Sequence, residues 1–147
     1  TGDKNEPEMQ KNKQILSFCK SNPIKFLGNL NLKEVAYINS KAKLFIGVDT
    51  SIMHISAANN TPVIAFFGPS GAFEWGPWDN DLQKSNYLSR KGVQSTNKHT
   101  VIQDDRYCVP CGDKGCENSG ISKCLTELDF GLISKIIKFK AEELKLI

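Results

Sequence analysis

The chain lacks any apolar run long enough to cross a bilayer, and it contains no internal repeat or low-complexity segment. A membrane-spanning helix needs about 20 consecutive apolar residues, so the sequence predicts no transmembrane segment. No secretory signal peptide is visible. A length of 147 residues suits one domain with a sizeable core. Because the chain opens at Thr1 without a methionine, we expect it to be part of a longer protein.

A strong charge of one sign is also missing. Lys and Arg together number 19 and Asp and Glu number 16, which gives a net charge of +3. The basic residues are scattered, and those of residues 135–145 alternate with apolar residues and glutamates, as on a solvated helix face. This pattern is too weak to predict nucleic-acid binding. A mild basic excess suits an anionic acceptor at a membrane surface but does not by itself predict one.

The most informative segment is residues 44–70, in which two apolar runs each end in a polar turn. The first run ends at Asp49, Thr50 and Ser51, a helix of small residues follows, and the second run ends at Gly68. This order predicts strand, turn, helix, strand and turn. Parallel strands joined in this way bring both turns to one edge of the sheet, where small ligands bind in open α/β folds.

The predicted helix after Asp49 offers an anion-binding site, because its first backbone N–H groups and positive dipole end are free. His54 follows Thr50 by four residues and Ser51 by three, so its ring should lie near the helix start. The alternative interpretation is that Asp49 caps the helix and that His54 is a half-buried histidine with its hydrogen bonds satisfied.

The position of the Asp49 carboxylate separates these interpretations. A carboxylate that capped the helix would compete with a phosphate for the same amides and would repel it. If Asp49 instead turns toward hydroxyl groups of a ligand, the amides of Thr50 and Ser51 stay open to a phosphate. The segment therefore predicts binding of a sugar phosphate or a nucleotide sugar rather than a simple anion.

The rest of the chain predicts alternating helices and strands, and therefore an α/β sheet. Asn31 and Glu34 form a capping-box pattern at the start of one helix. The near-continuous apolar runs are typical of parallel strands covered on both faces. Further helices are expected over residues 8–20 and 126–146, and strands over residues 24–27, 43–48, 62–67, 87–89 and 100–103.

Two motifs within residues 44–70 resemble a known family. Residues 47–58 (GVDTSIMHISAA), followed by residues 62–70 (PVIAFFGPS), look like the C-terminal signature of bacterial lipopolysaccharide heptosyltransferases, glycosyltransferase family 9. Residues 71–78 and 108–112 are similar to the heptosyltransferase III branch. The resemblance covers roughly residues 1–140 and implies a Rossmann-like parallel sheet flanked by helices. Residues 1–147 would then be the C-terminal, donor-binding half of a GT-B glycosyltransferase, without its N-terminal acceptor domain.

The resemblance also implies an activity. The expected reaction transfers heptose from ADP-heptose to a hydroxyl of the lipopolysaccharide inner core, and no metal cofactor is expected to be required. In this family the general base is an aspartate of the N-terminal domain, so this chain alone should be inactive. The expected partners are a nucleotide-sugar donor and the lipopolysaccharide acceptor, without nucleic acid. The expected location is the cytoplasm, with peripheral contact at the inner membrane.

The positions that match the family's donor-binding residues are Glu6, Leu30, Asp49, Thr50, Ser51, His54 and Gly68. By this resemblance Asp49 would orient sugar hydroxyls, with His54 supporting Asp49 or a phosphate. The amides of Thr50 and Ser51 would bind the diphosphate, although relatives often have glycine where Ser51 stands. Gly68 would let the following loop approach the ligand.

Glu6 and Leu30 are weaker candidates. In relatives a glutamate placed like Glu6 binds the ribose hydroxyls, for which a carboxylate is well suited. The alternative is a solvated loop glutamate. Leu30 lies in a stretch that lines the adenine pocket in relatives, where it would supply apolar contact. The alternative is an ordinary turn before the following helix.

Four of the five cysteines fall within residues 108–124, and three interpretations stay open. Cys108 and Cys111 have a metal-like spacing, whereas Cys116 and Cys124 do not. The four thiols could hold a structural zinc, could stay reduced for packing or acceptor contact, or could form disulfides on purification. His99 lies near no second ligand pattern, and we expect it at the surface.

Two other classes of function compete with the transferase. The first is a non-catalytic α/β module that binds a nucleotide or another anion. The second is an interaction domain stabilised by zinc at residues 108–124. A long loop carrying Trp75 and Trp78 fits either an acceptor contact or a small satellite apolar cluster.

Overall fold

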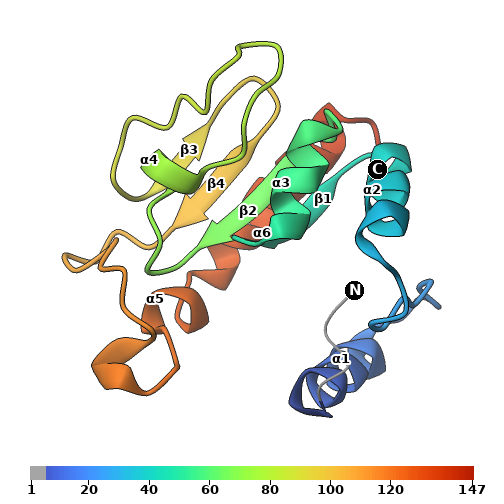
Figure 1. Cartoon of the computed structure of the whole chain (residues 1–147), viewed down its shortest axis with the longest axis horizontal. Helices are drawn as coiled ribbons and strands as arrows, with labels where there is room; N and C mark the ends of the chain where they lie inside the picture. Colours follow the sequence, from blue (N-terminus) through green and yellow to red (C-terminus); the bar gives the residue numbers. More distant parts are fainter. Residues whose placement is uncertain (1–5) are drawn as a thin grey trace. The chain divides into compact units, whose positions relative to one another are not determined.

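The computed structural model describes residues 6–147, apart from the side chains of Glu6 and Pro7. The chain divides into two compact units, Thr1–Ile38 and Asn39–Ile147 (Figure 1). Of the predicted donor-binding residues, all but Glu6 and Leu30 belong to the second unit.

The first unit contains helix α1 (Glu6–Phe18) and the start of helix α2 (Leu32–Lys41), which continues into the second unit. The predicted capping box is confirmed, because Asn31 Oδ1 accepts from the Lys33 and Glu34 amides at 3.0 Å and Glu34 Oε2 accepts from the Asn31 amide at 2.8 Å. The strand predicted over residues 24–27 is wrong. That segment is irregular, since it pairs with no other strand of the described chain.

The second unit is built on a four-stranded sheet of order β1-β2-β4-β3. Strands β1 (Phe45–Val48), β2 (Val63–Phe67) and β4 (Thr100–Gln103) are parallel to one another, as expected for this α/β fold. Strand β3 (Val93–Ser95) is antiparallel and forms the edge, so the sheet is mixed rather than wholly parallel. The strand predicted over residues 87–89 is wrong, because the strand that pairs with β4 lies further along the chain.

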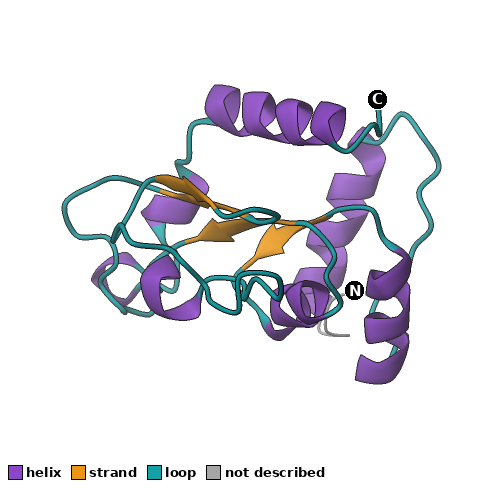
Figure 2. Ribbon diagram, turned by 90° about the horizontal axis from the view of Figure 1, so that it is seen from above, coloured by secondary structure: helices purple, strands orange, loops and turns teal. Residues whose placement is uncertain are grey.

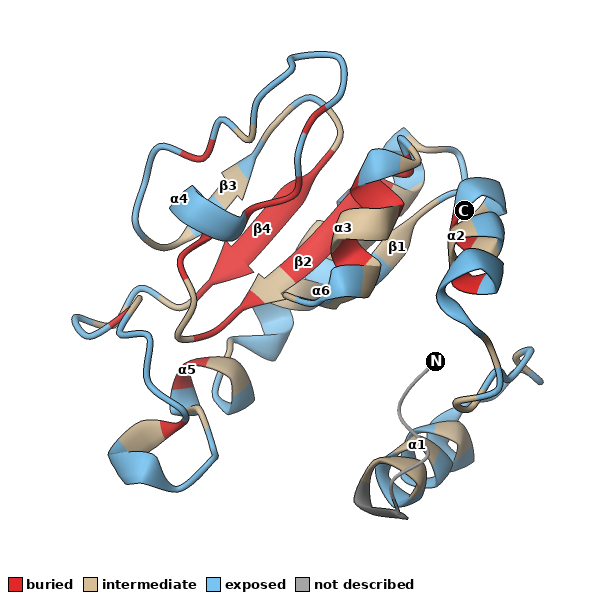
Figure 3. Cartoon of the chain, in the orientation of Figure 1, coloured by how far each residue is buried: buried red, intermediate tan, exposed pale blue. Residues whose placement is uncertain are grey.

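Helices cover both faces of this sheet. Helix α3 (Ser51–Ala58) lies on one face and α6 (Phe130–Glu143) on the other (Figure 2). Ser56 and Ala57 of α3 are fully buried, so their small side chains let the helix pack closely on the sheet. Strand β4 is buried along its whole length and β2 along most of it (Figure 3).

Shorter helices follow the sheet edges. Helix α4 (Ala72–Trp75) and helix α5 (Lys123–Thr126) are each one turn long. The terminal helix begins later than predicted, because Asp129 Oδ1 caps it by accepting from the amides of Gly131 at 2.8 Å and Leu132 at 3.1 Å. Among the described helices none is long and apolar enough to cross a membrane.

The prediction that His99 lies at the surface is wrong. The residue is 0% exposed and directly precedes β4, and both ring nitrogens lack a well-formed hydrogen bond within the described residues. Burial is the largest influence on the ring and lowers the pKa of His99, while the neighbouring Asp79 carboxylate opposes that shift. Tertiary packing of the long loop against the start of β4 therefore buries a neutral imidazole.

Asp79 is the acidic partner in this buried cluster. Burial opposes its ionisation, but the amides of Leu82 and Asp81 donate to its Oδ1 at 3.1 and 3.0 Å, and the pKa of Asp79 lies below its ordinary value. Its Oδ2 atom is buried without a hydrogen bond in the described part of the chain. Two hydrogen-bonded amides thus hold a carboxylate close to an uncharged histidine.

We predict that acid destabilises the chain through His99. Because the folded-state pKa of His99 lies below its unfolded value near 6.5, the unfolded chain takes up this proton first as the pH falls. Protonation of His99 therefore has little effect on the unfolding free energy above pH 6.5, and it lowers this free energy increasingly below that pH. Between pH 7.5 and 5.5 the wild type should lose more unfolding free energy than His99→Phe, by up to about 1 kcal/mol. Urea titrations at both pH values measure this, and equal losses in the two proteins would contradict it.

Candidate functional site

The site is centred on the adjacent ends of β1 and β2. Val48 pairs with Phe66 in the parallel register, and the Asp49 amide continues the ladder by donating to the Phe66 carbonyl at 3.2 Å. Asp49 and Ser70 therefore follow neighbouring strands at the same sheet edge. The Ser70 hydroxyl donates to Asp49 Oδ2 at 2.7 Å. The two polar turns predicted to meet do meet, through this hydrogen bond.

The carboxylate of Asp49 does not cap α3. The N-cap residue is Thr50, which makes no side-chain cap, and its hydroxyl lies 3.4 Å from the Val48 carbonyl instead. Asp49 Oδ1 lies 3.8 Å from His54 Nε2, so the carboxylate faces Ser70 on one side and the imidazole on the other. Thr50 and Ser51 are exposed at the start of the helix, and the binding of an anion there stays a prediction.

A cavity of about 410 Å³ lies beside Asp49, a size within the range of small-molecule sites. Asp49 and Gly68 line it, whereas Thr50, Ser51 and His54 stand outside its lining. The remaining walls come from the two strand ends and from the segment after β4: Val48, Phe66, Pro69, Ser70, Asp113, Lys114, Gly115, Gly120, Ser122 and Leu125.

Gln103, at the end of β4, fixes the turn after β2. Its Nε2 donates to the carbonyls of Gly68 at 2.9 Å and Ser70 at 2.7 Å, and the residue is 3% exposed. The turn that carries Ser70 is thereby held against the third parallel strand. The sequence offered only a polar residue that closes an apolar run as a signal for this role.

Gly68 has a packing role besides the predicted one, which stays a prediction. A Cβ atom at this position would lie 2.7 Å from Leu125 Cδ1 and 3.7 Å from Cys124 Sγ. The missing side chain thus makes room for α5, although Gly68 also lines the cavity. The close approach brings the cysteine-bearing segment onto the ends of the strands.

The four clustered cysteines are free thiols: Cys124 is buried, Cys116 is half-buried, and Cys108 and Cys111 are exposed. Burial is the main reason that the pKa of Cys124 is raised. Within the described residues no group of three or more His, Cys, Asp or Glu side chains is arranged to hold a metal ion. The hypothesis of a zinc site at these cysteines stays a prediction.

The other two predicted residues belong to the first unit. Leu30 lines a separate surface hollow of about 400 Å³ with Asn31 and with residues of α2, among them Tyr37. Glu6 begins α1, and its side chain lies outside the described residues. Contacts of Leu30 with adenine and of Glu6 with ribose stay predictions.

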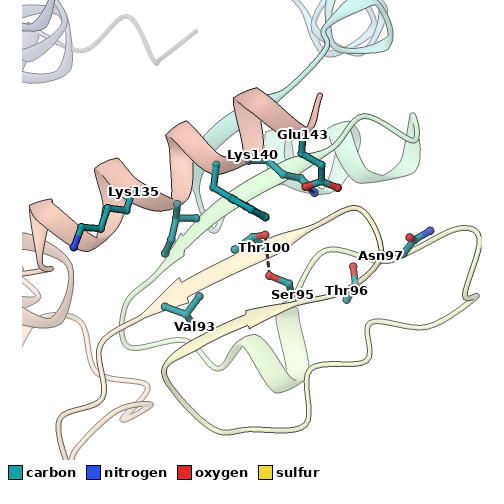
Figure 4. Close-up of a pocket in the computed structure, with 10 residues that line it drawn as sticks. Val93, Ser95, Thr96, Asn97, Thr100, Lys135, Lys140 and Glu143 are labelled. Atoms are coloured by element: carbon teal, nitrogen blue, oxygen red, sulfur yellow. Dashed lines mark hydrogen bonds and ion pairs between the residues drawn. The ribbon is translucent and has the colours of Figure 1, made fainter. Parts of the chain in front are cut away.

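A second cavity, of about 380 Å³, separates α6 from the β3–β4 hairpin (Figure 4). Its hairpin side carries the hydroxyls of Ser95 and Thr100, which lie 3.0 Å apart. Its helix side carries Lys140, whose Nζ forms an ion pair with Glu143 at 3.0 Å. No sequence pattern indicates this cavity, because its two walls come from segments about 40 residues apart along the chain.

Comparison with known proteins decides the family. The model of glycosyltransferase family 9 (heptosyltransferase) matches residues 1–121. This chain belongs to glycosyltransferase family 9. It is 39% identical over 103 residues to lipopolysaccharide heptosyltransferase 3 of Escherichia coli strain K12. The match covers 68% of this chain and 29% of that protein.

Two further relatives agree with this assignment. A second Escherichia coli lipopolysaccharide heptosyltransferase 3 is 39% identical over 70 residues, covering 47% of this chain and 21% of the relative. Lipooligosaccharide heptosyltransferase 2 of Campylobacter jejuni is 27% identical over 119 residues, covering 81% of this chain and 30% of that protein. The matched part of this chain thus spans less than a third of the length of each of these relatives. No solved structure matches it.

We predict that Gly68→Ala destabilises the chain through Leu125. The added methyl would overlap the Leu125 side chain at 2.7 Å, and overpacking of this kind costs about 1–3 kcal/mol. In a Leu125→Ala background the same change should cost less than about 0.5 kcal/mol, because the overlapping atoms are gone. Urea unfolding of the four proteins measures the coupling, and additive losses would show that Gly68 is needed for another reason.

Proposed function

We propose that this chain is the donor-binding part of a heptosyltransferase that transfers heptose from ADP-heptose to the lipopolysaccharide core. The observation that carries the proposal is the orientation of Asp49, which is hydrogen-bonded to Ser70 and leaves the start of α3 uncapped. Membership of family 9 and the names of the relatives support the same conclusion.

The two halves of the site suit the two halves of a nucleotide sugar. A carboxylate accepts hydrogen bonds from sugar hydroxyls, and Asp49 lines the cavity where a sugar would lie. Thr50 and Ser51 are exposed, and amides at the start of a helix bind phosphoryl oxygens. Ser70 and His54 would keep the Asp49 carboxylate turned away from these amides, so that it does not compete with the phosphate.

The same arrangement would assist the chemical step. When the bond between the sugar and the diphosphate breaks, negative charge develops on the leaving diphosphate. Backbone N–H groups at Thr50 and Ser51 are held in place by the fold, so they would stabilise that charge without reorganisation. In this proposal the acceptor hydroxyl loses its proton to a base outside this chain, and the chain requires no metal for its own role.

Calorimetric titration of the chain with ADP and with ADP-heptose tests this proposal. Asp49→Ala should weaken ADP-heptose binding by about 10-fold or more, since two or more charge-assisted hydrogen bonds to sugar hydroxyls are lost. Binding of ADP, which lacks the sugar, should change much less. Asp105→Ala is the matched control, because Asp105 is an exposed carboxylate outside the cavity lining.

Three results are informative. Selective loss of ADP-heptose affinity in Asp49→Ala supports the donor site. Equal affinity of the wild type and Asp49→Ala for ADP-heptose would refute the role of Asp49. Absence of binding of either nucleotide to the wild-type chain would count against the donor site as a whole.

A further inference from the structure

The segment between β4 and α5 contributes a charged wall to the Asp49 cavity. Its residues Asp113, Lys114 and Gly115 line the same space as Asp49 and Ser70. Lys114 is the sole basic residue in the described lining, which otherwise carries the carboxylates of Asp49 and Asp113. One cation therefore shares a small cavity with two carboxylates.

The backbone on both sides of Lys114 is held by contacts, one with the turn after β2 and the others within the loop itself. The Gly112 amide donates to the Pro69 carbonyl at 2.9 Å, which ties the segment to the turn after β2. Gly115 is buried with φ +92°, and a Cβ there would lie 2.5 Å from the Ile121 backbone nitrogen. The Cys116 amide closes the loop by donating to the Ile121 carbonyl at 2.8 Å. Lys114 lies between the Gly112 and Cys116 hydrogen bonds along the chain.

The base of the segment is held as well. Arg106 Nη2 lies 2.7 Å from Asp104 Oδ2, just after β4, and 3.3 Å from Glu127 Oε2, just after α5. The hydrogen bond from Arg106 is the main reason that the pKa of Asp104 is lowered. The ion pairs of Arg106 therefore join the two ends of the segment that carries Lys114, and the Gly112 hydrogen bond attaches its middle to the turn after β2. These contacts place the Lys114 backbone beside the cavity.

The Lys114 ammonium has no hydrogen bond or ion pair among the described residues, whereas Lys98, Lys138 and Lys140 each pair with a carboxylate. An ammonium group forms its strongest contacts with phosphoryl and carboxylate oxygens. The cavity carboxylates would repel a wholly anionic ligand, so a ligand that combines hydroxyl groups with a phosphoryl group matches the lining best.

We propose that Lys114 binds a phosphoryl group of the ligand in the Asp49 cavity and thereby determines which ligands the site accepts. This inference rests on the proposed function of that site. The phosphoryl group has two potential sources, the diphosphate of the donor and a phosphoryl substituent on the acceptor sugar. The chemistry at Lys114 is the same for both, and ligand titrations distinguish them.

The test compares Lys114→Met with Lys123→Met, in which an exposed lysine outside the cavity lining is changed in the same way. Each protein is titrated calorimetrically with ADP, with adenosine and with mannose 6-phosphate. If the donor is the source, Lys114→Met weakens ADP binding by about 3- to 20-fold and leaves adenosine binding unchanged. If the acceptor is the source, ADP binding is unchanged and binding of mannose 6-phosphate falls by a similar factor. Lys123→Met stays within about twofold of the wild type.

Further measurements keep the test decisive. Lys114→Arg should restore most of the lost affinity, because the charge returns, and raising the salt concentration should reduce the difference between the wild type and Lys114→Met. Thermal unfolding of each variant shows whether its fold is intact. Lys114→Met that binds ADP and mannose 6-phosphate as the wild type does would overturn this inference alone. A wild-type chain that binds neither would overturn the proposed function, and this inference with it.

Discussion

The hydrogen bond from Ser70 to Asp49 Oδ2 is the contact on which the site depends. It joins the turns that follow β1 and β2, and it directs the carboxylate along the sheet edge instead of onto α3. A free aspartate before a helix would cap it, because unsatisfied amides attract the nearest acceptor. Asp49 is engaged by Ser70 and faces His54, so the carboxylate and the helix start are separate groups, as the proposed function requires.

The third parallel strand makes this arrangement rigid. Gln103 donates from the end of β4 to the carbonyls of Gly68 and Ser70, so the turn that carries Ser70 is fixed by a buried amide. A buried amide that lost its carbonyl partners would be costly, which favours a single conformation of the turn. Gly68 adds to this by admitting Leu125, which brings α5 against the same turn.

The cavity that results has mixed charge, and under the proposed function this balance would decide which ligands it binds. Asp49 and Asp113 would exclude a ligand made only of phosphoryl groups, and Lys114 would be left unpaired by a ligand made only of hydroxyls. A glycosyl phosphate combines both kinds of group. The segment after β4, which carries the clustered cysteines, thus lines the cavity with its glycines and its lysine, while its thiols are free.

The sequence alone determined the features that depend on neighbours along the chain. Strands β1, β2 and β4, the helix after Asp49 and the capping box at Asn31 follow from local apolar patterns and from contacts within a few residues. Tertiary structure decided the rest. The pairing of β3, the burial of His99, the hydrogen bonds of Gln103 across 33 and 35 residues and the place of Lys114 at the cavity depend on contacts between segments far apart in the chain. Such contacts leave no periodic signal in the sequence, because they form only when the sheet has brought its strand ends together.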